Sequence, residues 1–138
     1  MSRLNNSISP IRDPQVIRVL ERMNNERKHP PQELFREAPV LDPEKFSGYG
    51  FSIAPEQGEL IYLLCRAMKA TRVVDFATSV GMSALYFAAA MKDNGGGLVI
   101  GSEMVREKAE VASRNLAEAG LTSFVDIRVG DARETLKD

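Results

Sequence analysis

Residues 72–83, RVVDFATSVGMS, are the stretch around which the rest of the chain is organised. Val73, Val74 and Phe76 form a short apolar run that predicts a buried parallel strand over residues 72–77. Small residues follow up to Gly81, and the next residues are typical of a helix. A strand, a tight turn and a helix bring backbone N–H groups to one point, which is typical of a phosphate- or cofactor-binding corner.

Length and composition indicate one globular domain. The chain has 138 residues, 43% hydrophobic and 27% charged, which is enough for a core. A formal net charge of −1 gives no electrostatic footprint for nucleic acid or an anionic membrane, and no apolar run is long enough to span a bilayer. No signal peptide is visible, and the single Cys65 cannot form an internal disulfide, so we expect a cytoplasmic protein.

Helix-type and strand-type patterns alternate along the chain. The predicted helices cover residues 14–27, 30–36, 56–69, 81–92 and 105–119, the predicted strands cover residues 72–77, 98–103 and 124–129, and a last helix begins at Arg133. Right-handed crossovers would place the three strands side by side in a parallel sheet, in the order third-second-first.

The segments before the first strand are expected to be helices and loops. The helix over residues 30–36 should turn Leu34 and Phe35 inward, and residues 37–51 form either a lid over a pocket or a plain surface loop. The helix over residues 56–69 is expected to have an apolar face made of Leu60, Ile61, Leu64, Cys65 and Met68. Cys65 is therefore interpreted as packing rather than as a nucleophile.

Only half of a doubly wound sheet is expected. The first strand normally lies in the middle of such a sheet, and at an edge it would be an aggregation liability. We therefore expect the chain to be a fragment, or another chain to cover that edge. Residues 1–51 would be an N-terminal helical segment and loop, and residues 52–138 the cofactor-binding half, within a single domain overall.

Acidic residues converge at the carboxyl ends of the predicted strands, where ligands bind in open α/β sheets. Asp75 lies at the end of the first strand, Glu103 at the end of the second, and Asp131-Ala132 after the third. Glu103 is placed to accept hydrogen bonds from both hydroxyls of a ribose, which suits any adenosine cofactor. Asp131 is equally suited to capping a helix.

The turn after the first strand separates two kinds of adenosine cofactor. A dinucleotide fold typically needs the glycines of G-x-G-x-x-G, whereas residues 77–81 contain only Gly81. An acid at Asp75 repels a pyrophosphate but suits the ammonium group of S-adenosylmethionine, which carries no phosphate. The turn therefore favours S-adenosylmethionine over a nicotinamide dinucleotide.

At these residues the sequence resembles a known family. Residues 75–85, DFATSVGMSAL, are similar to the acid-x-Gly-Thr-x-x-Gly-Tyr-Ser-Ala motif of the catechol and caffeoyl-coenzyme A O-methyltransferases. Residues 52–58, Glu103 and the Gly-Asp-Ala of residues 130–132 are similar to further parts of that family, so the resemblance covers about residues 52–136. It implies a Rossmann-like class I methyltransferase fold, S-adenosylmethionine as cofactor and a small-molecule methyl acceptor.

The resemblance also implies a role for each matching residue. The implied cofactor-binding residues are Ile53, Asp75, Ala77, Thr78, Gly81, Ser83, Glu103, Asp131 and Ala132. Ile53 and Asp75 would border the methionine end of the cofactor, Glu103 would hold the ribose, and Asp131-Ala132 would border the adenine. Ser83 would contact the carboxylate or amino group of the cofactor, or else only satisfies the first helical turn.

Two residues depart from the family pattern, which has Gly at the position of Ala77 and Tyr at that of Met82. A methyl group at Ala77 would crowd the cofactor or require a wider turn. Many members of the family bind a divalent cation through Asp and Asn residues after the next strand, and those positions lie beyond Asp138. No metal ligand and no catalytic base is therefore assigned, and His29 is not expected to be catalytic.

The leading hypothesis is an S-adenosylmethionine-dependent O-methyltransferase, represented by its N-terminal portion, that methylates a hydroxyl oxygen of a small molecule. One alternative is a non-catalytic, degenerate or truncated cofactor-binding module, which Ala77 motivates. Another is an NAD(P)-dependent reductase, which the single turn glycine disfavours. The helices before the sheet are candidates for the acceptor pocket or for a homodimer contact.

Overall fold

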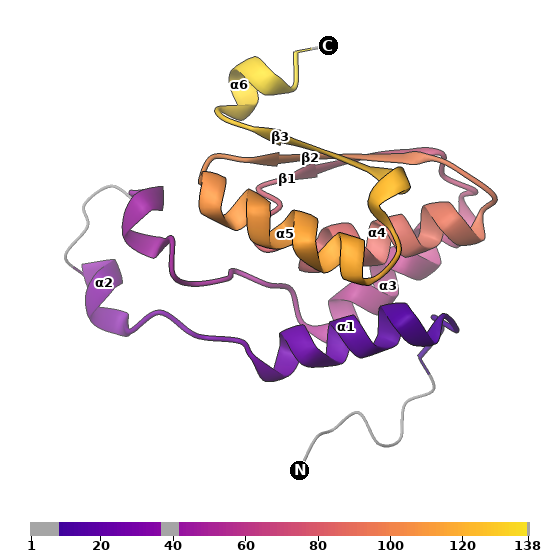
Figure 1. Cartoon of the computed structure of the whole chain (residues 1–138), viewed down its shortest axis with the longest axis horizontal. Helices are drawn as coiled ribbons and strands as arrows, with labels where there is room; N and C mark the ends of the chain where they lie inside the picture. Colours follow the sequence, from indigo (N-terminus) through magenta and orange to yellow (C-terminus); the bar gives the residue numbers. More distant parts are fainter. Residues whose placement is uncertain (1–8, 37–41, 138) are drawn as a thin grey trace.

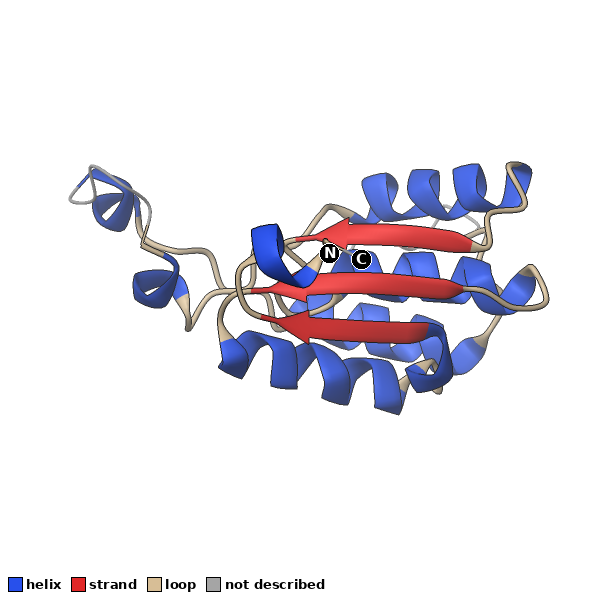
Figure 2. Cartoon of the chain, turned by 90° about the horizontal axis from the view of Figure 1, so that it is seen from above, coloured by secondary structure: helices blue, strands red, loops and turns tan. Residues whose placement is uncertain are grey.

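Three parallel strands form the sheet of the computed structural model, which describes residues 9–36 and 42–137. The strands β1 (Arg72–Phe76), β2 (Leu98–Glu103) and β3 (Val125–Val129) lie in the order β1-β2-β3 (Figure 2), so the predicted order is confirmed. In the middle of the sheet, Asp75 pairs with Gly101, and Gly101 pairs with Ile127. The expectations for residues 1–8, 37–41 and 138 lie outside the described residues.

Helices surround this sheet at the predicted places. They are α1 (Pro14–Asn25), α2 (Gln32–Arg36), α3 (Pro55–Ala67), α4 (Met82–Asp93), α5 (Arg106–Glu118) and α6 (Ala132–Thr135), with short 3-10 helices η2 (Pro43–Phe46) and η3 (Thr122–Phe124). The predicted α-helices begin and end within two residues of these bounds. The 3-10 helices were not predicted, and η2 lies inside the segment that we expected to be a loop.

The helices are unequally divided between the two faces of the sheet. In Figure 1, α4 and α5 lie on one face with α1 and α3 beyond them, while on the other face the described part of the chain has only the short α6. Small residues allow this close packing, because the alanines of α4 are buried. The core therefore lies between the sheet and the α4–α5 layer, where Leu85, Met91, Val99 and Leu116 are almost completely buried.

One prediction for β1 is wrong, because the strand is buried on one face only. Val73 and Asp75 point toward the helical layer, whereas Val74 and Phe76 are 56% and 72% exposed. Successive side chains of a strand point to opposite faces, and in the described part of the chain no helix crosses the outer face over β1. The sheet is open at this edge.

The prediction for the apolar face of α3 is wrong for three of its five residues, while Cys65 is buried and Ile61 packs partly buried against the core. The exposed residues of that predicted face are Leu60, Leu64 and Met68. The helix instead buries Gly58, Tyr62 and Cys65, of which Cys65 alone was predicted to pack inward. Gly58 determines this orientation, because a Cβ there would lie 2.1 Å from a ring atom of Tyr86 on α4.

Residues of α2 do not point into the core as expected. The helix has no buried residue, and Phe35 is 46% exposed. Leu34 is half-buried, and the Phe35 ring packs instead on Phe46 of η2, with 5.1 Å between the ring centroids. None of the helices in the described part combines the length and apolar character that crossing a bilayer requires.

Candidate functional site

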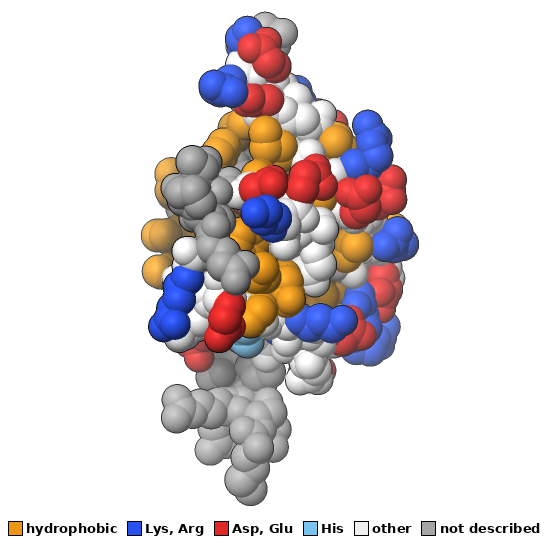
Figure 3. All heavy atoms as spheres, turned by 90° about the vertical axis from the view of Figure 1, so that its left-hand side faces the viewer, with side chains coloured by type: hydrophobic (Ala, Val, Ile, Leu, Met, Phe, Trp, Pro, Cys, Tyr) orange, Lys and Arg blue, Asp and Glu red, His pale blue; other side chains and the backbone are white. Residues whose placement is uncertain are grey.

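A cleft of about 700 Å³ lies at the carboxyl ends of the three strands. Figure 3 looks onto this end of the molecule, where hydrophobic side chains lie between acidic and basic ones. The parts of the sheet edge that line the cleft are the turn after β1, the end of β2 and the turn after β3. Its lining includes Ala77, Ser79, Ser102, Glu103, Gly130, Asp131 and Ala132 from these segments. The cleft is therefore where the sequence predicted a ligand site.

The turn after β1 has an unusual backbone. Ala77 and Ser79 adopt left-handed conformations, with φ of 60° and 52°. Thr78 lies between them and anchors the turn: its N–H donates to the Ser102 carbonyl at 2.9 Å, and its hydroxyl donates to the Asp75 carbonyl at 2.9 Å. The turn is thus held by β1 and β2, while the exposed Ala77 lies on the cleft wall.

Gly81 contributes to the site indirectly. It precedes α4 with φ of 93°, and a Cβ there would lie 3.1 Å from the Ala112 side chain and 3.2 Å from the Ala112 backbone. Glycine therefore allows α5 to pack closely against the turn. Gly81 and Thr78 support the cleft from behind and are not among the residues that line it.

Glu103 joins two segments of the site. Its side chain is buried and lines the cleft, and each of its oxygens accepts one backbone hydrogen bond. The Ser79 N–H donates to Oε2 at 2.7 Å, and the Val105 N–H donates to Oε1 at 2.9 Å. Since an ionised carboxylate has about four acceptor sites, each oxygen retains capacity for a further donor.

Asp75 lies behind the turn rather than on the cleft wall. Its carboxylate is only 6% exposed, and the Ser83 hydroxyl lies 2.9 and 3.0 Å from its two oxygens. Burial raises the pKa of Asp75 above its ordinary value, and the hydrogen bond from Ser83 opposes that rise. The hydroxyl of Ser83 therefore donates to Asp75 of β1, a contact that neither of the two predicted roles for Ser83 included.

Asp131 acts as the helix cap that the sequence allowed, and it also lines the cleft. Its carboxylate accepts from the Arg133 N–H at 2.9 Å and pairs with the Arg133 guanidinium at 2.6 Å. These contacts with Arg133 lower the pKa of Asp131 to about 2.

Ile53, unlike the residues above, does not line this cleft and instead lines a separate pocket of about 340 Å³ beside Arg27 and His29.

Aromatic side chains that were not predicted as site residues cover the cleft. Figures 1 and 2 show that α2 and η2 extend beyond the carboxyl ends of the strands. The centroids of Phe46 and Phe51 lie 5.6 Å apart, and both rings line the cleft. The Phe51 N–H donates to the Ser79 hydroxyl at 3.2 Å, which ties this segment to the turn. The aromatic-rich composition of residues 37–51 was the only signal for this cover.

Lys108 of α5 was also missed. Its side chain is 5% exposed, lines the cleft, and places its ammonium 4.9 Å from the centroid of the Phe51 ring. Burial lowers the pKa of Lys108, and the nearby Glu103 carboxylate opposes that effect. In the sequence it is one of several charged residues on an amphipathic helix, so no local pattern distinguishes it.

The sequence is similar to known O-methyltransferases. A family model described as O-methyltransferase matches residues 33–138. A catechol O-methyltransferase of Niastella koreensis is 36% identical over 85 residues, and one of Mycobacterium tuberculosis is 34% identical over 85 residues. Each alignment covers 62% of this chain and 38% of the relative. The alignments thus span well under half the length of these relatives.

Solved structures have the same fold. The O-methyltransferase TomG of Streptomyces achromogenes, which is involved in tomaymycin synthesis and was solved in complex with SAM, superposes with a TM-score of 0.60. It is 26% identical, and the match covers 91% of this chain and 46% of that protein. An O-methyltransferase of Bacillus cereus at 21% identity has a TM-score of 0.62 and supports the fold alone.

Proposed function

The chain belongs to the O-methyltransferase family, and on that premise we propose that it forms the cofactor-binding part of an enzyme that methylates a hydroxyl oxygen of a small molecule with S-adenosylmethionine. The observation that carries the proposal is the buried Glu103 on the wall of a cleft at the carboxyl ends of three parallel strands. A volume of about 700 Å³ suits a cofactor of this size, since small-molecule sites span roughly 300–1,000 Å³.

The cleft offers suitable chemistry for an adenosine group. Glu103 is fixed by two backbone N–H donors, so its remaining acceptor sites are oriented before a ribose hydroxyl arrives. We assign Asp131 and Ala132 to the adenine end, because they lie across the same cleft from the turn after β1. Residues 52–138, which contain all these positions, form the proposed cofactor-binding half of the domain.

The methionine end would lie over the turn after β1. Ala77 borders it directly, while Thr78 and Gly81 shape the turn from behind and Asp75 adds negative potential beneath it. Ser83 would act through Asp75 rather than by direct contact, because its hydroxyl already donates there. Ile53 would reach the cofactor only if the segment before α3 moves, since that side chain lies in the neighbouring pocket.

Bound S-adenosylmethionine supplies an electrophilic methyl group on a sulfonium. The residues of this chain hold and orient the two reactants, and such positioning is worth up to roughly 7–11 kcal/mol in well-aligned reactions. The rings of Phe46 and Phe51 would provide an apolar wall beside the bound cofactor. Within residues 9–36 and 42–137 no group of three His, Cys, Asp or Glu side chains is placed to hold a metal ion, so no step is assigned to one.

Calorimetric titration with S-adenosylhomocysteine tests the proposal. We expect binding to the wild-type chain, and a loss of about 10- to 100-fold in affinity for Glu103→Gln, because one charged acceptor is removed. Glu110→Gln on the exposed face of α5 is the matched control and should bind like the wild type. Titration with NADH is expected to give no heat; binding of NADH instead would favour a reductase, and binding of neither would favour a non-catalytic module.

A further inference from the structure

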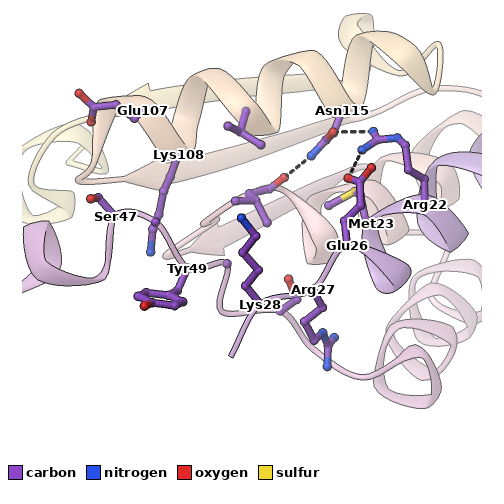
Figure 4. Close-up of a pocket in the computed structure, with 15 residues that line it drawn as sticks. Arg22, Met23, Glu26, Arg27, Lys28, Ser47, Tyr49, Glu107, Lys108 and Asn115 are labelled. Carbon is purple, nitrogen blue, oxygen red and sulfur yellow. Dashed lines mark hydrogen bonds and ion pairs between the residues drawn. The ribbon is translucent and has the colours of Figure 1, made fainter. Parts of the chain in front are cut away.

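A second cavity, of about 520 Å³, lies on the other side of the segment that covers the cofactor cleft. Its walls come from the C-terminal end of α1, from residues 47–52 and from the first half of α5 (Figure 4). Tyr49 and Ser52 contribute polar atoms to these walls, and Val80 contributes an apolar side chain. Nothing in the proposed handling of the cofactor uses this space.

Two lysines face this cavity from opposite walls. In Figure 4, Lys108 projects from α5 toward Tyr49, and Lys28 projects from the segment after α1 toward the same space. Among residues 9–36 and 42–137, neither ammonium makes an ion pair or a hydrogen bond, and the Lys108 ammonium lies over the Phe51 ring. Lys28 and Lys108 therefore have no ion-pair partner in the part of the chain that the structure describes, although the Glu103 carboxylate on the cofactor-cleft side lies close enough to act on Lys108.

The carboxylates that line the cavity, Glu26 and Glu107, form no ion pair with these lysines within the described residues. Glu26 pairs with Arg22 at 2.8 Å, and Arg22 also pairs with Glu118 at 2.7 Å. Figure 4 shows Glu107 pointing away from the cavity. The Arg22 guanidinium further donates to the Asn115 amide oxygen at 2.8 Å, so this end of the cavity is already satisfied.

Lys108 carries most of the argument. Lys108 as a residue is only 5% exposed, so its ammonium loses part of its hydration, and a buried charge is normally compensated by an opposite charge. Burial lowers the pKa of Lys108, and the Glu103 carboxylate opposes that effect only in part. Lys108 also lines the cofactor cleft, so an anion bound to it would lie next to the place where methyl transfer is proposed.

We propose that this cavity binds an oxyanion of the methyl acceptor, a carboxylate or a phosphate, with Lys108 and Lys28 as its cationic partners. The assignment of the ligand as the methyl acceptor rests on the proposed function; the binding of the anion does not. The acceptor would then be an acidic hydroxylated small molecule, whose charged end lies in this cavity and whose hydroxyl points toward the cofactor cleft.

The test is a set of titrations on the full 138-residue chain in a zwitterionic buffer, with benzoate, its uncharged analogue benzamide and inorganic phosphate as probes. We expect benzoate or phosphate to bind at least tenfold more tightly than benzamide. Lys108→Met should weaken anion binding at least tenfold, and Lys28→Met, at the more exposed position, about threefold. Lys92→Met is the control and should bind the anions as the wild type does. Lys92 lies in the last turn of α4, does not line the cavity, and pairs with Asp13.

The melting temperature of each variant shows whether it is still folded. Lys108→Met removes an unpaired buried charge and keeps an apolar side chain of similar length, so its melting temperature should not fall. Anion binding no tighter than that of benzamide, or equal anion affinity in wild type and Lys108→Met, would overturn the proposal. Titration with S-adenosylhomocysteine distinguishes the two proposals. If the anions bind and S-adenosylhomocysteine does not, the cavity assignment stands and the proposed function is overturned. If S-adenosylhomocysteine binds and the anions do not, only the cavity assignment is overturned.

Discussion

Replacing Ala77 by glycine should stabilise the protein, which is unusual for an alanine-to-glycine change. Ala77 has a φ of 60°, in the left-handed region where a side chain crowds the backbone. The turn is held in place by the bond from the Thr78 N–H to the Ser102 carbonyl, so the glycine variant should keep the same backbone. The exposed alanine methyl group makes no part of the core that would be lost.

The size of the effect follows from two opposing contributions. A left-handed conformation costs a non-glycine residue about 1–2 kcal/mol. Glycine in turn lowers stability by about 0.4–1 kcal/mol, because it has more conformational freedom than alanine in the unfolded chain. The difference for Ala77→Gly is a gain of about 0.8 kcal/mol, which corresponds to a rise of about 3 °C in melting temperature for a chain of this size.

Thermal and urea unfolding of the variant, the wild type and one control measure this difference. Ala117→Gly is the control, because Ala117 is exposed inside α5, where glycine should cost about 1 kcal/mol. The two substitutions are chemically identical and should change stability in opposite directions. A melting temperature for Ala77→Gly that is unchanged or lower, with the expected fall in Ala117→Gly, would refute the assignment of backbone strain to the turn.

Two further predictions concern the residues behind the site. Asp75→Asn should raise the free energy of unfolding at pH 7. Burial raises the pKa of Asp75, so the protonated carboxyl contributes its full share of stability below the ordinary pKa of 3.8. That stability is lost as the pH rises through the raised pKa of the folded state, and the uncharged asparagine avoids this loss. Unfolding measured across pH 3–8 should show a flatter profile for the variant, and an unchanged profile would contradict the account. Gly58→Ala should cost about 1–3 kcal/mol, because its Cβ would lie 2.1 Å from the Tyr86 ring. Gly48→Ala, where nothing lies within 4 Å, should be close to neutral in the same urea unfolding assay, and equal effects at both glycines would contradict the packing argument.

The parts of the fold that depend on local pattern could be predicted from the sequence. The capping pair at the start of α1, the alanines of α4 and the carboxylate at the end of β2 each carry their signal within a few residues. Given three strand–helix alternations, right-handed crossovers that lie on the same face of the sheet then place the strands in sequential order. Ala77, Glu103, Asp131 and Ala132 were found for the same reason, since all of them follow strand ends.

Features that depend on contacts between distant segments could not be predicted. An apolar stripe on α3 is visible in the sequence, but which stripe is buried depends on Gly58 meeting Tyr86, 28 positions later. Phe51 and Lys108 meet across the cleft in the same way. Hydrophobic periodicity reports only the period of an element, and the face that becomes buried depends on its neighbours.

Glu103 has two requirements to meet, and they explain why a glutamate suits this position. Its oxygens receive N–H groups from the turn after β1 and from the segment before α5, so the carboxylate holds together the two backbone segments on which a cofactor would lie. An amide side chain could accept only one of these bonds and would present a donor to the other N–H. The residue proposed to bind the ribose therefore also organises the site before any ligand arrives, and its loss should weaken binding partly by loosening the turn that contains Ser79. The loss of affinity for S-adenosylhomocysteine in Glu103→Gln should therefore be interpreted together with the free energy of unfolding of the same variant.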